Sequence, residues 1–179
     1  MCGLAGYLYP GFTDGSFGRH VVEAMTSAIT HRGPDSEGHW VERNAGLALG
    51  HRRLSILDLS SAGSQPMHSA CGRYVIAFNG EIYNHLMIRS ELKGLNSSPT
   101  RWRGYSDTET LLAAFSQWGM DKTLERCIGM FAIALWDRQQ QTLTLARDRF
   151  GEKPLYYGFA QGISSRANGA VTGRGALLF

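Results

Sequence analysis

The chain has 179 residues, of which 43% are hydrophobic, and a formal net charge of +3. This length suits one domain with a substantial core, and the weak charge, with no run of Lys and Arg on one periodic face, favours neither a nucleic-acid groove nor a membrane patch. No signal-type leader and no apolar stretch of about 18 residues is found, so we expect a cytoplasmic protein that binds neither nucleic acid nor membrane.

The spacing of cysteine and histidine argues against a metal site. Cys2, Cys71 and Cys127 are far apart and form no C-x-x-C pair, so neither a disulfide framework nor a structural zinc site is expected. No two histidines have the helical spacing of metal ligands, and no glycine-rich phosphate loop occurs. We therefore expect no metal and no cofactor in this domain, and a reducing compartment.

The first half of the chain predicts one helix between short strands. Val21, Met25 and Ile29 recur every four residues, the pattern of an amphipathic helix that ends near Thr30. In chain order we expect a strand over 4–9, a turn-rich loop over 10–18, a polar loop over 31–38, and two strands at 39–41 and 47–50 that form a hairpin through 44–46.

The second half predicts longer strands and further helices. Ser106 and Glu109 have the capping-box spacing, which predicts a helix start. The remaining elements are a loop over 60–68, a strand over 74–78, a helix over about 84–95, a short helix near 121–127, and strands over 130–136, 142–146 and 155–157.

Strands in hairpins, with helices inserted in blocks, are typical of antiparallel sheets with segregated helices, the α+β class. Residues 2–160 are expected to form the domain. Residues 161–179 are rich in Gly, Ala, Ser and Arg and lack periodicity until the last few residues, which predicts an atypical, poorly ordered or truncated tail.

Cys2 is a candidate nucleophile. If Met1 is removed, Cys2 carries both a thiol and a free α-amine. The amine titrates at about 7.7–8.0 and a thiol near 8.5, so the amine is able to act as a base close to neutral pH. This pairing activates N-terminal nucleophiles. The alternative is a small buried cysteine on an edge strand.

Asn79 and Gly80 follow a predicted strand and allow two interpretations. An Asn-Gly pair after a strand is the commonest signal of a type I′ hairpin turn. Alternatively, the Asn79 amide and the Gly80 N–H form an oxyanion hole for a tetrahedral intermediate. Glu81, directly after the pair, is not required by a plain hairpin.

Three further charged side chains also allow two interpretations each. Arg52 and Arg53 lie at a predicted strand end, where a guanidinium suits a substrate carboxylate, although both could be solvated surface arginines. Asp107 lies in the first turn of a predicted helix, where the helix dipole favours an acid; alternatively, it faces a substrate ammonium.

Together these residues make the chain resemble the glutaminase domain of class II glutamine amidotransferases, more narrowly that of glutamine-hydrolysing asparagine synthases. The Gly-Pro-Asp loop and the segment at 53–58 point to the narrower group. The matching segments are 1–3 (MCG), 31–35 (HRGPD), 53–58 (RLSILD), 78–84 (FNGEIYN), 106–109 (SDTE), 129–137 (GMFAIALWD) and 147–157 (RDRFGEKPLYY).

The resemblance implies a four-layer αββα sandwich of the N-terminal-nucleophile hydrolase type. It implies that Cys2 attacks the glutamine side-chain amide, with Asn79 and Gly80 as the oxyanion hole. Arg53 would bind the α-carboxylate, and Asp107, with Glu81, the α-ammonium. The glutamine-binding set so implied is Arg53, Leu54, Ser55, Ile56, Leu57, Asn79, Gly80, Glu81 and Asp107.

The resemblance also implies partners. L-Glutamine would be the substrate, and a synthetase domain that binds ATP and Mg and amidates aspartate normally follows in the same chain. A second copy of the chain is a further candidate partner. The Ser-Gly-Gly-x-Asp-Ser loop of that synthetase does not occur in these residues, so we expect the glutaminase half only. The alternatives are a truncated non-catalytic remnant with an unpaired sheet edge, or an amidotransferase with another acceptor.

Overall fold

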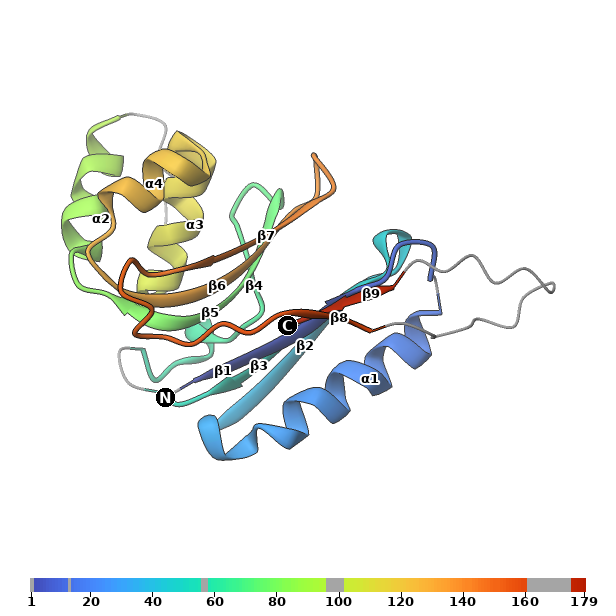
Figure 1. The fold of residues 1–179 in the computed structure, drawn as a ribbon. Coiled ribbons are helices and arrows are strands. Elements are labelled where there is room, and N and C mark those ends of the chain that lie inside the picture. Colours follow the sequence, from blue (N-terminus) through green and yellow to red (C-terminus); the bar gives the residue numbers. More distant parts are fainter. Residues whose placement is uncertain (1, 13, 56–57, 96–101, 161–174) are drawn as a thin grey trace, which may run out of the picture.

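The computed structural model describes residues 2–12, 14–55, 58–95, 102–160 and 175–179. The described part forms two antiparallel sheets (Figure 1). The first sheet has the spatial order β2 (Ser36–Glu42), β3 (Leu47–Arg53), β1 (Gly3–Leu8), β9 (Ala176–Leu178) and β8 (Gly158–Ala160). The second has the order β4 (Met67–His68), β5 (Tyr74–Ile82), β6 (Gly129–Asp137) and β7 (Thr142–Arg147).

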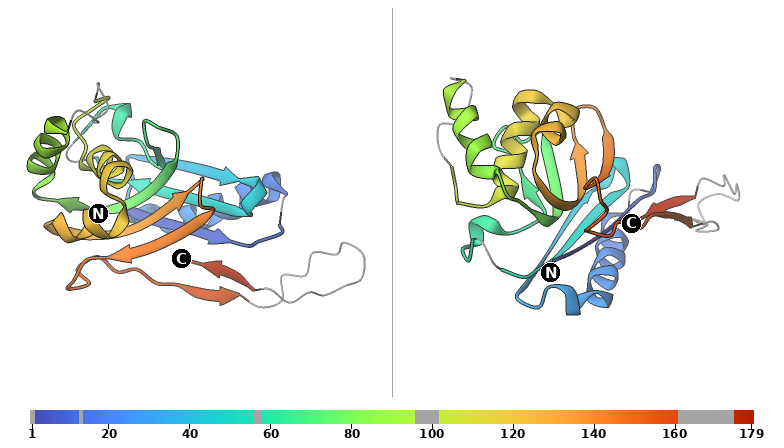
Figure 2. Two further views of the ribbon diagram at one scale, coloured as in Figure 1. Left: turned by 90° about the horizontal axis from the view of Figure 1, so that it is seen from above. Right: turned by 60° about the vertical axis from the view of Figure 1, so that its left-hand side comes forward.

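Helices cover the outer face of each sheet (Figures 1 and 2). Helix α1 (Gly15–Ala28) packs on the first sheet, and α2 (His85–Gly94), α3 (Asp107–Trp118) and α4 (Met120–Arg126) lie on the second. The inner faces of the sheets bury a shared apolar layer: Leu47, Leu49, Val75, Ala77, Ala134 and Trp136. This arrangement confirms the predicted four-layer αββα sandwich, since each sheet face and each helix stripe is buried against another layer.

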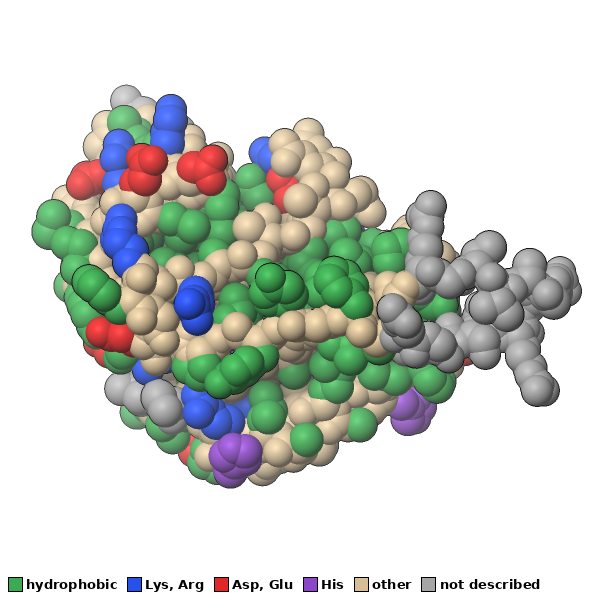
Figure 3. Space-filling model, viewed as in Figure 1, with side chains coloured by type: hydrophobic (Ala, Val, Ile, Leu, Met, Phe, Trp, Pro, Cys, Tyr) green, Lys and Arg blue, Asp and Glu red, His purple; other side chains and the backbone are tan. Residues whose placement is uncertain are grey.

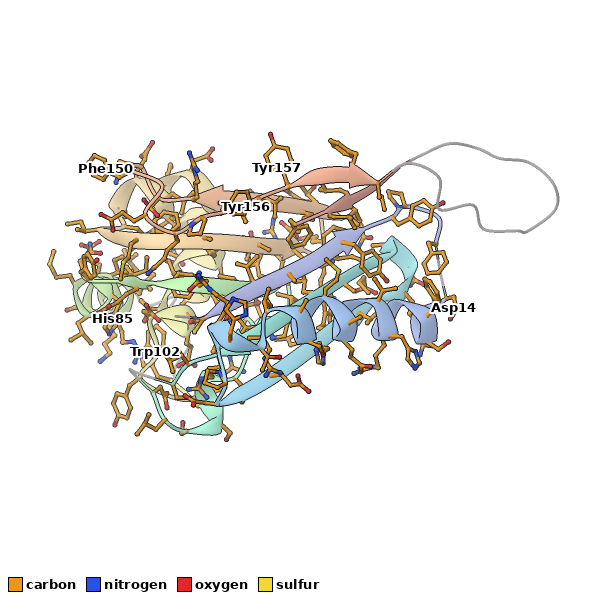
Figure 4. The ribbon with its side chains drawn as sticks, turned by 60° about the horizontal axis from the view of Figure 1, so that its bottom comes forward. Asp14, His85, Trp102, Phe150, Tyr156 and Tyr157 are labelled. Atoms are coloured by element: carbon orange, nitrogen blue, oxygen red, sulfur yellow. The ribbon has the colours of Figure 1, made fainter. Side chains whose placement is uncertain are left out.

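Helix α1 begins earlier than predicted. Asp14 caps it, because its carboxylate accepts hydrogen bonds from the N–H groups of Ser16 at 3.0 Å and Phe17 at 3.1 Å. Figure 4 shows Asp14 at this end of the helix. The prediction of a loop through residue 18 was therefore wrong for Gly15 onward, because the glycines there suggested a turn although an Asx cap starts the helix. The predicted hairpin between β2 and β3 is present.

The start of α3 was predicted correctly, but its capping box is only partly formed as expected. Ser106 Oγ accepts from the Glu109 N–H at 3.3 Å. The Glu109 carboxylate instead accepts from the N–H groups of Arg103 at 2.9 Å and Gly104 at 3.1 Å. The Glu109 carboxylate thus fixes the segment before α3. It also interacts favourably with the positive end of the helix dipole.

The segment before β8 corrects the last predicted strand. Residues 155–157 are not a strand, and the chain pairs only from Gly158 onward. Tyr156 and Tyr157 are 82% and 70% exposed, so their apolar rings are not alternately buried as a strand pattern requires. With Phe150 they project outward from this segment (Figure 4), on a face where hydrophobic side chains gather (Figure 3).

The end of the chain corrects the predicted tail. Ala176–Leu178 form β9, which pairs with both β1 and β8, and the Phe179 N–H donates to the Gly6 carbonyl at 3.0 Å. The expectation of disorder was thus wrong for these last residues, because pairing, and not local periodicity, makes them a strand. The rest of the predicted tail, residues 161–174, lies outside the described residues. The C-terminal residues thus pair with β1 at Gly6, Tyr7 and Leu8.

A buried carboxylate organises the turn after β7. Asp148 accepts backbone hydrogen bonds from Phe131, Phe150, Glu152 and Lys153 at 2.9–3.1 Å. Burial disfavours its charged form, but these four donors outweigh burial and lower the pKa of Asp148 to about 2.

Asp148→Asn is therefore expected to lower the free energy of unfolding at neutral pH by about 2–4 kcal/mol, because an amide nitrogen would leave N–H donors unpaired at about 1–3 kcal/mol each. The folded pKa lies below the unfolded value of about 3.9, so the wild-type contribution is present above about pH 4 and is lost as the pH falls toward 2. Urea unfolding at neutral pH and at the low pH where the Asp148 carboxylate is protonated measures this contribution to the free energy of unfolding. Asp121→Asn, which replaces an exposed acid, is the control. Equal losses of unfolding free energy in the two variants would contradict the stabilising role assigned to Asp148.

Candidate active site

A cavity opens at one end of the sandwich, where the start of β1, the end of β3 and the end of β5 meet. Of the predicted site residues it is lined by Cys2, Arg53, Leu54, Asn79, Gly80, Glu81 and Asp107. Ser55 is not in its lining, and Ile56 and Leu57 lie outside the described residues. Segments far apart in the sequence thus bring the predicted thiol, guanidinium, Asn79 amide and two predicted carboxylates around the same space.

Cys2 is positioned by pairing between β1 and β3. Gly3 lies opposite Arg52, so the residue before it runs alongside Arg53 and Leu54. The Cys2 Sγ accepts from the Leu54 N–H at 3.4 Å and lies 3.6 Å from the Leu54 carbonyl oxygen. Cys2 is half-buried and free, not the fully buried core cysteine of the alternative interpretation.

The loop before β2 holds the end of β3 in place. The Asp35 carboxylate accepts from the Ser55 N–H at 2.8 Å, and the Asp35 N–H donates to the Arg53 carbonyl at 3.1 Å. A Cβ at Gly33 would lie 2.4 Å from the Arg52 carbonyl carbon, so only glycine permits this approach. The predicted Gly-Pro-Asp loop therefore supports the backbone against which Cys2 lies.

The two arginines lie on opposite faces of β3. Arg53 lines the cavity, and its guanidinium donates to the carbonyl oxygens of Asp58 and of Ser60, the latter at 3.0 Å. Arg52 is buried and pairs with the Glu37 carboxylate away from the cavity. Because side chains alternate along a strand, only one of the adjacent arginines can face the site. Neither is an exposed surface arginine.

The loop after β3 fixes the Arg53 guanidinium. A Cβ at Gly63 would lie 2.3 Å from Arg53 Nη2, so the side chain packs directly on glycine backbone. The Asp58 carboxylate shapes this loop by accepting from the Ser60 hydroxyl at 2.6 Å and the Tyr105 N–H at 3.0 Å. The hydrogen bond from Ser60 is the main cause that lowers the pKa of Asp58, although burial opposes it.

Asn79 and Gly80 are not a hairpin turn. Strand β5 continues through them to Ile82, with Asn79 opposite Ala132 and Gly80 opposite Phe131. The turn interpretation was wrong because β6 pairs along the whole of β5. Gly80 is required for another reason, since a Cβ there would lie 2.3 Å from the Met130 carbonyl oxygen. Both residues line the cavity, and Asn79 is only 5% exposed.

The edge of β5 that faces away from β6 leaves Gly80 open. On this edge the Phe78 N–H donates to Gln65 Oε1 at 2.6 Å, and the Ile82 N–H donates to Asp107 Oδ2 at 3.0 Å. Edge groups recur every second residue, so the Gly80 N–H lies between these two on the cavity side. Within the described residues neither its N–H nor its carbonyl has a hydrogen-bond partner.

The two carboxylates predicted to bind the substrate differ in environment. Asp107 opens helix α3 and is 4% exposed, with hydrogen bonds from the N–H groups of Ile82 and, at 2.8 Å, Thr108. Burial raises the pKa of Asp107, and the Ile82 N–H works against this rise. Glu81 is half-buried on β5. A positive charge bound in the cavity would offset the free-energy cost of burying the Asp107 carboxylate.

Several lining residues were missed by sequence reasoning: Asp58, Gly63, Gln65, Phe78, Ser106, Thr108, Met130 and Lys153. Gln65 lies in a loop where no pattern marked it. Lys153 lies in a segment that matched the family but carried no assigned role, and it is buried. Among the described residues no group of three or more His, Cys, Asp or Glu side chains is placed to hold a metal ion. No described helix is both long and apolar enough to span a membrane.

The two packed antiparallel sheets with helices on their outer faces define the class of fold, that of the N-terminal-nucleophile hydrolases. The solved structure of glutamine phosphoribosylpyrophosphate amidotransferase from Bacillus subtilis has this fold, with a TM-score of 0.65, 16% identity, and coverage of 98% of this chain and 41% of that one. Residues 1–170 match the glutamine amidotransferase domain family. The chain belongs to this family, which confirms the resemblance inferred from its motifs.

Curated relatives include an amidase of Gibberella zeae named chry2, 38% identical over 165 residues, and the glutamine-hydrolyzing asparagine synthetases 2 and 1 of Bacillus subtilis, 39% identical over 160 and 38% over 164 residues. Each match covers 88% of this chain but only 24%, 20% and 24% of the respective relative. The chain thus spans a quarter or less of the length of these relatives.

Proposed function

We propose that this chain hydrolyses the side-chain amide of L-glutamine to glutamate and ammonia, with Cys2 as the nucleophile. The observation that carries the proposal is the shared cavity. It is lined by the Cys2 thiol, by the Asn79 amide and the unpaired Gly80 N–H, and by the Arg53 and Asp107 side chains. A zwitterionic amino acid needs one cation and one anion for its head group, and amide hydrolysis needs a nucleophile and oxyanion donors.

The proposed reaction begins after removal of Met1. The α-amine of Cys2 takes the thiol proton as the sulfur attacks the amide carbon, and negative charge moves to the amide oxygen. The Asn79 side chain and the Gly80 N–H stabilise that oxygen. The amine returns the proton to the leaving nitrogen, the C–N bond breaks, and ammonia departs. Water then cleaves the γ-glutamyl thioester, which releases glutamate and restores the thiol.

Head-group recognition follows from the charges around the cavity. Arg53, held by two backbone carbonyls, is proposed to bind the α-carboxylate, and Asp107, with Glu81, the α-ammonium. Leu54, whose N–H contacts the Cys2 Sγ, is proposed to complete the pocket. A preorganised guanidinium suits this role because its planar fork binds both carboxylate oxygens.

Arg53→Lys is expected to reduce kcat/KM for glutamine about 10–100-fold, mainly through a higher KM, because a lysine loses the second charge-assisted hydrogen bond, worth about 1.5–3 kcal/mol. Steady-state kinetics of glutamate formation measures this. Arg19→Lys, on the exposed face of α1, is the matched control and is expected to leave KM unchanged. An unaltered KM in Arg53→Lys would place the carboxylate elsewhere.

For the released ammonia, we propose a synthetase partner that uses ATP and Mg to amidate aspartate. The support is that relatives of this domain are named glutamine-hydrolyzing asparagine synthetases, of which the match covers only 20% and 24%. The amidase name of another relative at similar identity supports amide chemistry without naming an acceptor, so a different acceptor stays the alternative. A second copy of the chain is a further proposed partner.

The direct test of the proposed function is to incubate the chain with L-glutamine and measure glutamate and ammonia by an enzyme-coupled assay. Equimolar formation of both is expected. The rival interpretation, a non-catalytic remnant that binds glutamine, predicts that glutamine binds by calorimetry while no glutamate forms.

A further inference from the structure

The open position on β5 is bordered by side chains that occupy the edge groups of its neighbours. At Phe78, two residues before Gly80, Gln65 Oε1 accepts the N–H at 2.6 Å and His51 Nε2 lies 3.0 Å from the carbonyl oxygen. Strand β4 pairs with β5 only at Val75 and Ile76, so it does not reach this point. At Phe78 the two side chains thus make the hydrogen bonds that a neighbouring strand would make. At Gly80 no side chain does so among the described residues.

His51 reaches Phe78 from the other sheet. It lies on the inner face of β3, in the alternating series that begins with Leu47 and Leu49 and ends at Arg53. The imidazole is fully buried, and burial lowers the pKa of His51 to about 4, so the ring is neutral near pH 7. Because its partner is a carbonyl oxygen, Nε2 carries the proton and donates it.

Burial of the His51 imidazole leaves one polar atom without a hydrogen bond among the described residues, so packing alone does not explain a histidine at this position. The other ring nitrogen of His51, Nδ1, is buried without a partner in the described part of the chain. An apolar side chain on this inner face would extend the layer formed by Leu47 and Leu49 without leaving such a nitrogen. What the imidazole adds is one hydrogen bond to the peptide that joins Phe78 to Asn79.

Gln65 couples the peptide on the other side of Phe78, the one that carries the Phe78 N–H, to the opposite wall. Its Nε2 lies 3.4 Å from the Thr108 Oγ1, in the first turn of α3 beside Asp107. Phe78 is therefore held between β3 and α3, directly before the two residues proposed as oxyanion donors. Displacement of a catalytic group by about 1 Å is enough to reduce rates about a hundredfold.

We propose that His51 and Gln65 are positioning residues of the oxyanion hole: they clamp the Phe78 backbone at its carbonyl and its N–H, which sets the Asn79 amide and leaves the Gly80 N–H free for the substrate oxygen. This inference rests on the proposed glutaminase function. It assigns neither residue a contact with the reacting atoms of glutamine. The clamp acts on the transition state, so it should affect kcat and not ground-state binding.

The test compares His51→Leu, which removes the donor, with His51→Gln, whose side-chain amide places a donor near the Nε2 position. In His51→Leu, kcat is expected to fall roughly 10–100-fold, while the Kd of L-glutamine, measured by calorimetry in a Cys2→Ala background, stays within about threefold. His51→Gln is expected to restore most of kcat. Gln65→Met, which removes the acceptor, is expected to lower kcat in the same way.

Ser69→Ala is the matched control, because Ser69 Oγ accepts the edge N–H of Tyr74 at 3.0 Å at the far end of the same strand. It is expected to leave kcat unchanged. The proposal is overturned if folded His51→Leu or Gln65→Met turns over like the wild type, or if kcat and affinity fall together. Should His51→Leu fail to fold, Gln65→Met decides alone. A wild-type chain without glutaminase activity would overturn the proposed function itself, whereas an active wild type with unaffected variants overturns only the clamp.

Discussion

Replacement of Cys2 by alanine is expected to abolish glutamine hydrolysis, with a loss of at least about a thousandfold in kcat. The reason is that the thiol supplies the bond that becomes the γ-glutamyl thioester, and no other described cysteine lines the cavity. Because Cys2 is half-buried beside Leu54 and an alanine fits that space, the variant should fold and still bind glutamine. Glutamate formation at saturating glutamine measures the effect.

Cys71→Ala is the control for this variant. Cys71 is exposed and lies against Ser69 and Ser116, away from the cavity. Its replacement is expected to leave turnover unchanged. Retained hydrolysis in Cys2→Ala would show that another group is the nucleophile and would end the proposed mechanism.

Replacement of Asn79 by alanine is expected to reduce kcat about 10²–10³-fold while KM for glutamine changes little, the effect of losing one oxyanion donor. The Asn79 side chain is nearly buried at the cavity and, within the described residues, has no hydrogen-bond partner in the protein. Its amide is therefore available to a substrate oxygen. The same steady-state assay separates kcat from KM.

Asn44→Ala, in the exposed turn between β2 and β3, provides the matched control for loss of an asparagine amide. No change in kcat is expected there. If Asn79→Ala raises KM as strongly as it lowers kcat, the amide binds the ground state and the oxyanion role is contradicted.

The layers of the fold were predictable because apolar periodicity reports which face of each element is buried. The ends of elements were less so. Asp14 starts a helix through a side-chain cap within a glycine-rich stretch, and residues 176–178 become a strand only by pairing with β1 and β8. Tertiary pairing of this kind leaves no local pattern in the sequence.

In the site, too, some residues could be predicted from the sequence and others depend on tertiary contacts. Cys2, Arg53 and Asp107 each allowed two interpretations on their own and became site candidates through the family resemblance, and the cavity places them together. Asn79 was ambiguous because an Asn-Gly pair has the same local signature in a turn as in a strand, and only the full length of β6 distinguishes the two. His51 carried no signal, since its role depends on Phe78, which lies in the other sheet.

The most direct test of the central claim is the intact mass of the purified chain before and after exposure to 6-diazo-5-oxo-L-norleucine, a glutamine-mimicking electrophile. The proposal predicts a chain without Met1 that gains a single adduct, mapped to Cys2 by peptide mass spectrometry and absent from Cys2→Ala. A chain that retains Met1, or an adduct that persists in Cys2→Ala, would contradict the assignment of Cys2 as an N-terminal nucleophile.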